Sequence, residues 1–296
     1  MIAPDPSGIS AEVLSHRPRL LGLAYRKLGD AQEAEDIVQE AYLRWLRIDP
    51  ATVQSPEAWL VTVVSRLALD RLRRSATERA AYAGPWLPAP VATPSPDAGA
   101  ERASDLSIAL LMLLERLAPE ERAAFLLRDV FDTGYAEIAH ALGRSEAAVR
   151  QMVHRARERV RAGRPRFAPP PEARERLLHR FLQALADDDR DGVLALLAPD
   201  VTFTTDGGGK VPAARNVVSG ADRVCRFVLG LERKYGGRTG HRVAPVNGHP
   251  ALLTFWEGRL LAVTELAMDG ERIVAFYRVM NPDKLRHAAD SAPEIE

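Results

Sequence analysis

The stretch YAEIAHALGRSEAAVRQMVHRARERV, residues 135–160, has the pattern of two helices joined by a tight turn. The first helix would place three apolar residues on one side, namely Ile138, Ala139 and Leu142. Gly143 can leave a helix through positive φ, and the Ser145 hydroxyl can cap the next helix. Four residues of that second helix fall within one narrow apolar arc: Val149, Val153, Ala156 and Val160. The sequence therefore predicts a helix-turn-helix.

The opposite arc of the second helix presents hydrogen-bond donors. An Arg side chain suits the edge of guanine and a Gln side chain that of adenine. Helical hairpins of this kind need not touch DNA, but seven arginines and one acid lie between residues 150 and 166 of a chain whose 40 basic and 40 acidic residues cancel. This clustering favours a DNA-reading helix. The candidate DNA-binding residues here are Ser145, Ala147, Arg150, Gln151, His154, Arg157 and Arg161.

Composition limits the remaining classes of protein. A chain of 296 residues with 46% apolar residues can form two or three domains, each with its own core. The single cysteine, Cys225, excludes an intramolecular disulfide, and we expect no metal and no cofactor. The amino terminus lacks a signal-peptide pattern, and the longest apolar stretch, residues 108–114, is too short to span a bilayer. We expect a soluble, cytoplasmic protein with no membrane partner.

Residues 11–78 have a helical pattern with breaks at Gly29-Asp30 and between residues 49 and 56. Asp30 and Glu33 have the spacing of a capping box. The helix that follows would bury Ala34, Ile37, Val38, Ala41 and Trp45. Its other face would present Asp36, Gln39, Glu40 and Leu43. Such a face can be merely solvated, but an apolar residue surrounded by charge suggests a docking surface.

The next helix, from Pro56, interleaves aromatic and basic residues in the run EAWLVTVVSRLALDRLRR. Side chains of these two kinds can stack on unpaired bases and hold phosphates. The candidates are Trp59, Arg66, Arg73 and Arg74. A single Trp at helical spacing can also be a core residue, and for Trp59 the core interpretation is favoured.

Three segments together resemble the extracytoplasmic-function (ECF) RNA polymerase sigma factors: AEDIVQEAYLRW at 34–45, PEAWLVTVVSRLALDRLRR at 56–74, and the helix-turn-helix. The resemblance implies that Asp36, Gln39, Glu40 and Leu43 bind the β′ clamp of core RNA polymerase. It implies that the helix after Pro56 reads and opens the proximal (minus-ten) promoter element, and that the helix after Ser145 reads the distal (minus-thirty-five) element. Many family members have Arg-Asn where this chain has Ser65-Arg66, which leaves the proximal base preference open.

The pattern changes after residue 171, where helices are followed by alternating or β-branched runs. Strands are expected at 201–205, 241–246, 252–257, 259–268 and 272–279. Turns with Gly separate them, and those at Glu257-Gly258 and Asp269-Gly270 have hairpin spacing. Helices followed by a meander of strands predict an α+β cone. This part of the chain resembles the SnoaL-like, ketosteroid-isomerase-like fold.

Three short motifs extend the resemblance to nearly the whole chain. Sigma factors with a fused SnoaL-like domain share WLPEP, DGGGK and NPDK, and here the motifs are WLPAP at 86–90, DGGGK at 206–210 and NPDK at 281–284. From the residues alone, DGGGK is either an anion-binding loop or, more simply, a flexible hairpin tip. The implied regulatory contacts are Trp86, Leu87, Pro88, Asp206, Gly207, Gly208, Gly209, Lys210, Asn281, Pro282, Asp283 and Lys284.

The expected architecture is multidomain, with all-α region-two and region-four sigma domains followed by an α+β cone-shaped SnoaL-like domain. The expected order is a region-two domain at 1–78, a linker at 79–104, a region-four domain at 105–163, a Pro-rich linker at 164–171, the cone at 172–285 and a tail at 286–296. Because Trp86 and Leu87 are unusual in a free linker, we expect the first linker to lie in a groove.

The predicted function is that of a sigma factor, not an enzyme, which binds core RNA polymerase and promoter DNA. We expect the cone to pack against the region-two domain and the WLPAP linker and to restrain promoter binding. Two alternatives remain: an enzyme of the cone fold using Asp206 and Tyr277, and a ligand-sensing repressor, which would not need the acidic helix around residues 36–43. A small-molecule ligand in the cone is left open.

Overall fold

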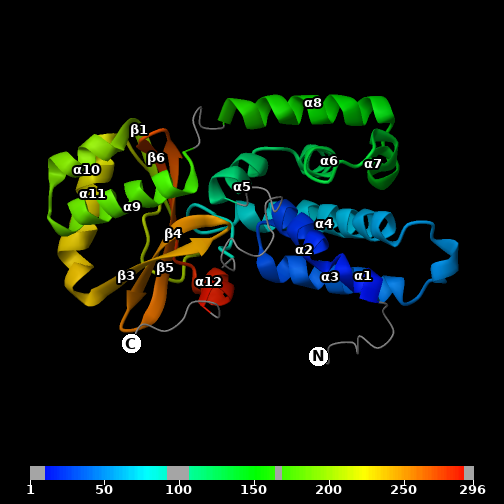
Figure 1. Ribbon diagram of the computed structural model, residues 1–296, viewed down its shortest axis with the longest axis horizontal. Helices are drawn as coiled ribbons and strands as arrows, with labels where there is room; N and C mark the ends of the chain where they lie inside the picture. The colour runs from blue at the N-terminus through cyan, green and yellow to red at the C-terminus, as the bar shows by residue number, and fades with distance from the viewer. Residues whose placement is uncertain (1–10, 92–106, 164–168, 290–296) are drawn as a thin grey trace. The chain divides into compact units, whose positions relative to one another are not determined.

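The computed structural model describes residues 11–91, 107–163 and 169–289 (Figure 1). The chain divides into two compact units, and each is described by itself. The helical unit comprises Met1–Ala80 and Leu113–Gly163. The cone unit comprises Ala81–Met112 and Arg164–Glu296, so it includes the segment with the WLPAP motif.

The first half of the helical unit contains the predicted helices and both predicted breaks. Its elements are α1 (Ala11–Ser15), α2 (Arg17–Leu28), α3 (Ala31–Trp45), the 3-10 turn η2 (Pro50–Thr52) and α4 (Pro56–Ala80). Gly29 ends α2 at φ 69°, and the Asp30 carboxylate accepts a hydrogen bond from the Glu33 N–H at 3.0 Å. The five predicted stripe residues of α3 are all buried. They pack with α2 and α4 around a common apolar core.

The second half of the helical unit contains the helix-turn-helix. Its elements are α5 (Ile108–Glu115), whose first residues belong to the cone unit, α6 (Pro119–Asp129), α7 (Tyr135–Leu142) and α8 (Glu146–Gly163). Gly143 adopts φ 64°, and the Ser145 hydroxyl accepts from the Ala148 N–H at 3.2 Å. The four predicted inward residues of α8 are buried. The predicted helix-turn-helix is therefore confirmed.

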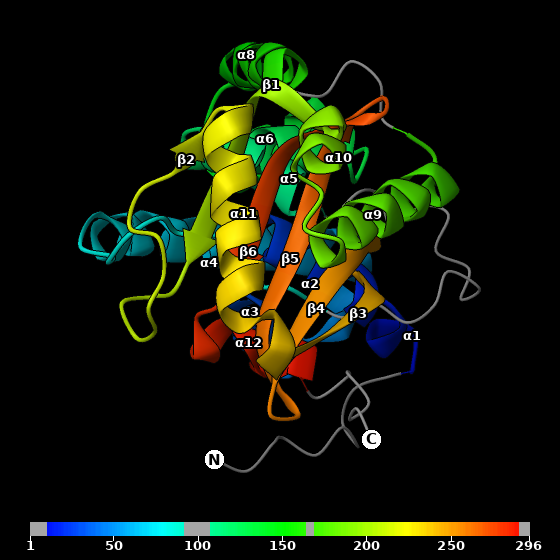
Figure 2. The same cartoon turned by 90° about the vertical axis from the view of Figure 1, so that its left-hand side faces the viewer.

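The cone unit is a six-stranded sheet with helices packed against it (Figure 2). Its strands are β1 (Leu197–Asp206), β2 (Val218–Ser219), β3 (Thr239–Val246), β4 (His249–Trp256), β5 (Arg259–Asp269) and β6 (Arg272–Val279). They lie in the order β2-β1-β6-β5-β4-β3, and the β1 and β6 pair is parallel while the other pairs are antiparallel. Its helices are α9 (Pro171–Ala186), α10 (Arg190–Leu196), α11 (Ala221–Tyr235) and α12 (Pro282–Ala289).

The five predicted strands and the α+β class are confirmed, with three additions. The turn at Asn247-Gly248, with φ of 54° and 80°, is also a hairpin, because it joins β3 to β4. Strand β2 has only two residues, which is too short for an alternating pattern. Helix α12 begins within the NPDK motif, for which the sequence pattern predicts no helix.

The two faces of the sheet have separate cores. One face packs on α9 and α11, which lie across it in Figure 2, through a cluster that includes Phe181, Phe203 and Phe276. The other face buries Leu87, Ile108 at the start of α5, and Leu285 and Ala288 of α12. The predicted linker segment is therefore packed on the cone as part of its second core.

Candidate promoter-binding surfaces and the linker site

The acidic face of α3 is open to a partner. Asp36 and Gln39 are exposed, while Glu40 and Leu43 are partly exposed. Among the described residues the two carboxylates make local contacts, since Asp36 accepts from Gln32 at 3.2 Å and Glu40 pairs with Arg44 at 2.9 Å. Exposed pairs one helical turn apart contribute about 0.3–0.5 kcal/mol each and can be exchanged easily. The four residues form one surface, and their docking role stays a prediction.

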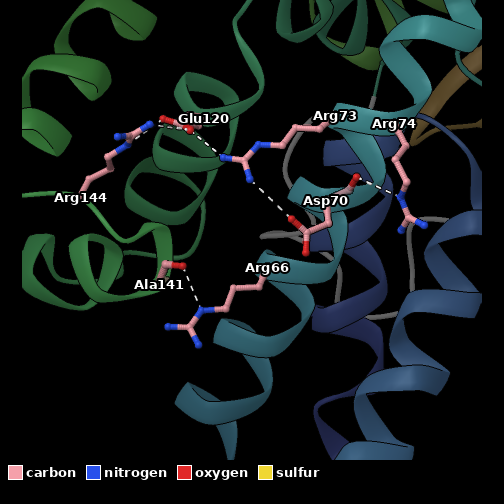
Figure 3. Close-up of polar contacts among 7 residues, drawn as sticks. All are labelled: Arg66, Asp70, Arg73, Arg74, Glu120, Ala141 and Arg144. Atoms are coloured by element: carbon pink, nitrogen blue, oxygen red, sulfur yellow. Dashed lines mark hydrogen bonds and ion pairs between the residues drawn. The ribbon is translucent and has the colours of Figure 1, made fainter.

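The basic face of α4 contacts the second half of the helical unit (Figure 3). Arg66 donates from Nε to the Ala141 carbonyl and from Nη2 to the His140 carbonyl, both at 3.0 Å. These carbonyls belong to the last turn of α7, where helical carbonyls have no partner within the helix. Arg66 thus caps α7 with a side chain for which the sequence predicts a contact with DNA.

Arg73 makes the second contact from α4. Its Nη2 lies 2.7 Å from the Glu120 carboxylate of α6, which Arg144 also binds, with 3.0 Å between Arg144 Nη2 and Glu120 Oε1. The hydrogen bonds from Arg144 and Arg73 lower the pKa of Glu120. Arg74 instead donates to the Asp70 carbonyl of its own helix at 3.3 Å. Glu120 is therefore a shared anchor for two arginines (Figure 3).

Trp59 lies at the edge of the core in the first half of the helical unit. It is half-buried and packs edge to face on Trp45, with ring centroids 5.4 Å apart. The core interpretation therefore holds for the part of the Trp59 ring that packs on Trp45. Its predicted contact with promoter bases stays a prediction.

Helix α8 presents most of its predicted DNA-binding residues to solvent. Ser145 and five residues of α8 are exposed, namely Ala147, Arg150, Gln151, His154 and Arg161. The Arg150 guanidinium pairs with Glu146 and lies 4.3 Å from the centre of the Tyr135 ring. Arg157 differs, because it binds both oxygens of Asp129 on α6. Its guanidinium is held against α6, away from the outward arc.

Two more arginines of the basic cluster have internal partners. Arg155 and Arg159 both bind the carboxylate of Glu121, at 2.9 and 2.6 Å, and Glu121 is only 7% exposed. The density of arginine in the sequence is thus partly structural, since α6 supplies counter-charges. Sequence composition could not reveal these pairs or that of Arg157, because they join residues 28 to 38 positions apart.

The three motifs of the cone unit meet around the buried carboxylate of Asp206, at the end of β1. It accepts hydrogen bonds from the Leu87 N–H at 2.8 Å, the Tyr82 hydroxyl at 2.7 Å and the Gly208 N–H at 3.0 Å. Lys284 pairs with it at 2.7 Å, and the side chains of Lys284 and Asp206 are 7% and 0% exposed. Asp206 therefore joins the linker to both the DGGGK loop and the NPDK end of the cone.

Lys284 also contacts the linker directly. Its ammonium donates to the Leu87 carbonyl at 2.6 Å and lies 4.2 Å from the centre of the Trp86 ring. A cation over an aromatic face is attracted by the ring quadrupole. Asn281 adds a hydrogen bond to the Tyr82 hydroxyl at 2.8 Å. Burial and Asp206 raise the pKa of Tyr82, so its hydroxyl stays protonated and donating.

The DGGGK loop is packed rather than free. Gly208 has φ 61°, and a Cβ at this position would lie 2.3 Å from the Asn281 amide nitrogen. Lys210 pairs with Asp283, which ties the loop to the NPDK end. The expectation of a flexible hairpin tip is therefore wrong, because the loop needs Gly208 for close approach to Asn281. Among the other motif residues, Pro88 is buried and Pro282 is exposed.

Sequence reasoning missed two linker contacts. Tyr82 precedes the WLPAP motif and has no sequence signal of its own. Val91 exchanges hydrogen bonds with Asn247, whose side chain accepts at 2.9 Å and whose N–H donates at 2.8 Å. The sequence marks Asn247 only as a turn residue before Gly248.

The two candidate residues of the enzyme alternative do not line the cavity of the cone. Asp206 is engaged with Lys284 and the linker. Tyr277 packs with the core on the linker side of the sheet. Neither residue is therefore placed to act on a molecule in that cavity. In the described part of the chain, no group of three or more His, Cys, Asp or Glu side chains could hold a metal ion.

Comparison with known proteins agrees with this geometry. Residues 13–78 match the family model of Sigma-70 region 2, and residues 107–160 match that of Sigma-70 region 4. The chain is 44% identical over 282 residues to the ECF RNA polymerase sigma factor SigJ of Mycobacterium tuberculosis, covering 90% of each. The chain belongs to the ECF RNA polymerase sigma factors. It is also 34% identical over 288 residues to the probable sigma factor SigI of the same species, covering 95% of each.

The similarity to SigJ extends to the cone unit. The crystal structure of the Mycobacterium tuberculosis SigJ superposes with a TM-score of 0.78 at 38% identity, covering 96% of this chain and 99% of that one. The predicted fold class and sigma-factor function are therefore confirmed over the repressor and enzyme alternatives. Within the described ranges, none of the helices is both long and apolar enough to cross a membrane.

Proposed function

We propose that this sigma factor binds core RNA polymerase through the acidic face of α3 and reads promoter DNA with α4 and α8. It acts in the cytoplasm and performs no covalent chemistry. The observation that supports the assignment best is the outward arc of α8, where Arg150 and Gln151 are exposed on a helix fixed by Gly143 and Ser145. This is the geometry by which a recognition helix enters the major groove.

We further propose that the helical unit, as described, is a resting arrangement. Arg66 and Arg73 are side chains suited to phosphate, yet they bind the α7 carbonyls and Glu120. Exposed ion pairs contribute only about 0–1 kcal/mol. Charge-assisted hydrogen bonds from Arg to phosphate are stronger than neutral ones. Promoter DNA can therefore replace these contacts and free the basic face of α4.

The cone restrains the replacement of these arginine contacts by promoter DNA, and it acts through the chain that joins α4 to α5. Leu87 and Val91 are bound to the cone after α4, and the Ile108 N–H donates to the Glu265 carboxylate at 3.0 Å before α5. Both ends of the connection are therefore anchored, which limits how freely the two sigma domains can move apart. Packing of the cone against the region-two domain itself stays a prediction.

The function is tested by transcription with purified core polymerase on a library of randomised promoters. The transcribed promoters should share two elements. Arg150→Ala with Gln151→Ala should relax only the distal element, because each bidentate base contact contributes about 1–3 kcal/mol. Arg116→Ala, an exposed arginine outside the recognition helix, is the control. Unchanged selection at the distal element by the double variant would remove α8 from this role, and absence of polymerase-dependent transcripts would refute the function.

Glu120→Ala tests the resting arrangement. Loss of the shared anchor releases Arg73 and Arg144, so promoter affinity should rise by about two- to tenfold, as expected when two weak surface pairs are removed. Glu137→Ala removes the same charge from an exposed site on α7 and serves as the control. Binding is measured by fluorescence anisotropy with a labelled promoter. Equal affinities for the two variants would show that Glu120 does not restrain DNA binding.

A further inference from the structure

The cone contains a partly open cavity of about 550 Å³ between the sheet and the helices α9 and α11. Small-molecule sites in proteins usually measure about 300–1,000 Å³. Six aromatic side chains contribute to its wall, namely Phe181, Phe203, Phe227, Tyr235, Trp256 and Phe276. The cavity lies on the face of the sheet opposite the linker, so the linker core leaves it unfilled.

A cation, Arg278 of β6, lies in this apolar wall. The strand register places Thr205 of β1 and Thr264 of β5 directly beside it. Nη1 of Arg278 donates to the Thr264 hydroxyl at 3.2 Å, while its Nε is buried with no hydrogen-bond partner among the described residues. The hydroxyls of Thr205 and Thr254 are likewise buried and unpartnered within the described ranges. Three orphaned polar groups therefore line one cavity.

The charge of Arg278 is not balanced by a neighbouring carboxylate in the described part of the chain. The acidic residue of the lining, Glu232, faces His241 instead, with 3.6 Å between Oε2 and Nε2. Burial lowers the pKa of Arg278 to about 10, which leaves it protonated at neutral pH. Arg278 is partly buried, and a charge removed from water is costly unless it is paired. An anion in this cavity would supply the pair.

We propose that the cone binds an apolar monocarboxylate, with its apolar body against the aromatic wall and its carboxylate on Arg278. Nη1 already donates one of its two N–H groups to Thr264 and Nε has no partner among the described residues, so we assign both carboxylate oxygens to the Nε and Nη2 edge, a geometry that Arg prefers. The Thr205 and Thr254 hydroxyls can donate to the same group. A single negative charge matches the single cation, whereas a phosphate dianion would leave excess charge among apolar walls. Binding can be measured without reference to transcription, so its failure would leave the proposed sigma-factor function intact.

The test is isothermal titration calorimetry of the full-length protein with two matched acid and amide pairs: decanoate with decanamide, and 2-naphthoate with 2-naphthamide. At least one acid should bind ten or more times more tightly than its amide. Arg278→Met should abolish that preference, and Arg278→Lys, which keeps the charge but not the planar fork, should reduce it. Arg272→Met, at the exposed start of the same strand, is the control and should preserve it.

The comparison of acid and amide on the unmodified protein decides the proposal even if Arg278→Met does not fold. Equal affinities within both pairs, or no binding of either acid, would overturn it. Retention of the full preference by a folded Arg278→Met would also overturn it, because the carboxylate would then be bound elsewhere.

Discussion

Lys284→Met should destabilise the cone unit by about 3–5 kcal/mol, because it leaves the Asp206 carboxylate buried without its counter-charge. Asp206→Asn should have a similar effect by leaving the Lys284 ammonium without its carboxylate. The double variant should recover part of the loss, since two neutral groups replace a buried pair. Urea unfolding of the four proteins, followed by circular dichroism, gives the coupling energy between the two residues.

Lys210→Met is the matched control. Its ion pair with Asp283 also joins the DGGGK loop to the NPDK end, but the two side chains are 52% and 46% exposed. Pairs of this kind contribute about 0–1 kcal/mol. Simple additivity of Asp206→Asn and Lys284→Met would mean that the buried pair does not act as a unit.

The contact of Lys284 with Asp206 and the linker also provides a better test of regulation by the cone. Truncation after Phe167 is expected to raise promoter affinity or transcription, but it would also uncover Leu87 and Ile108, which are both 0% exposed in the intact chain. Truncation after Met280 would remove Lys284 and leave Asp206 without its counter-charge. Lys284→Met changes the linker contact while retaining the whole chain, so its effect on transcription separates linker release from loss of the cone under conditions where circular dichroism shows the cone to be folded.

Local signals explain what could be predicted from the sequence. The 3.6-residue period, the Asp30 and Ser145 caps and the positive φ of Gly143 are decided within a few residues. The strands follow from alternation, and the pairing of neighbouring strands from hairpin turns. These signals are sufficient for the long helices, the helix-turn-helix and the fold class, but not for α12.

Pairing across the chain could not be predicted in the same way. Asp206 binds Tyr82 and Leu87 across 124 and 119 positions, and no local pattern encodes that choice. The resemblance to sigma factors with a fused SnoaL-like domain implies a shared role for the three motifs, but only the structure shows which of their atoms form hydrogen bonds. The basic cluster of α8 likewise indicates the correct sign of charge, while its partners Asp129 and Glu121 lie on another helix. The partly buried Arg278 has no sequence signal, because an Arg in an alternating strand normally faces solvent.

Asp36→Arg combined with Glu40→Arg should abolish association with core RNA polymerase. Both carboxylates lie on the open face of α3, off its buried stripe, so the substitution removes almost no packing. The new arginine at position 40 would lie one helical turn from both Arg44 and the new arginine at position 36, and each like-charge pair at this spacing destabilises a helix by only about 0.2–0.5 kcal/mol. The expected loss of binding is therefore a property of the surface and not of folding. Co-purification with tagged core polymerase measures it.

Glu172→Arg combined with Glu175→Arg makes the same change in net charge on exposed positions of α9 and is the control. It should retain association, which separates a specific docking face from a general requirement for negative charge. Promoter binding by the α3 variant in isolation should be unchanged or slightly stronger, because added positive charge attracts DNA. If the α3 variant has a normal circular dichroism spectrum and still co-purifies with polymerase, the docking surface lies elsewhere on the chain. Loss of association by both double variants would instead show that net charge, rather than the face formed by Asp36, Gln39, Glu40 and Leu43, governs the encounter.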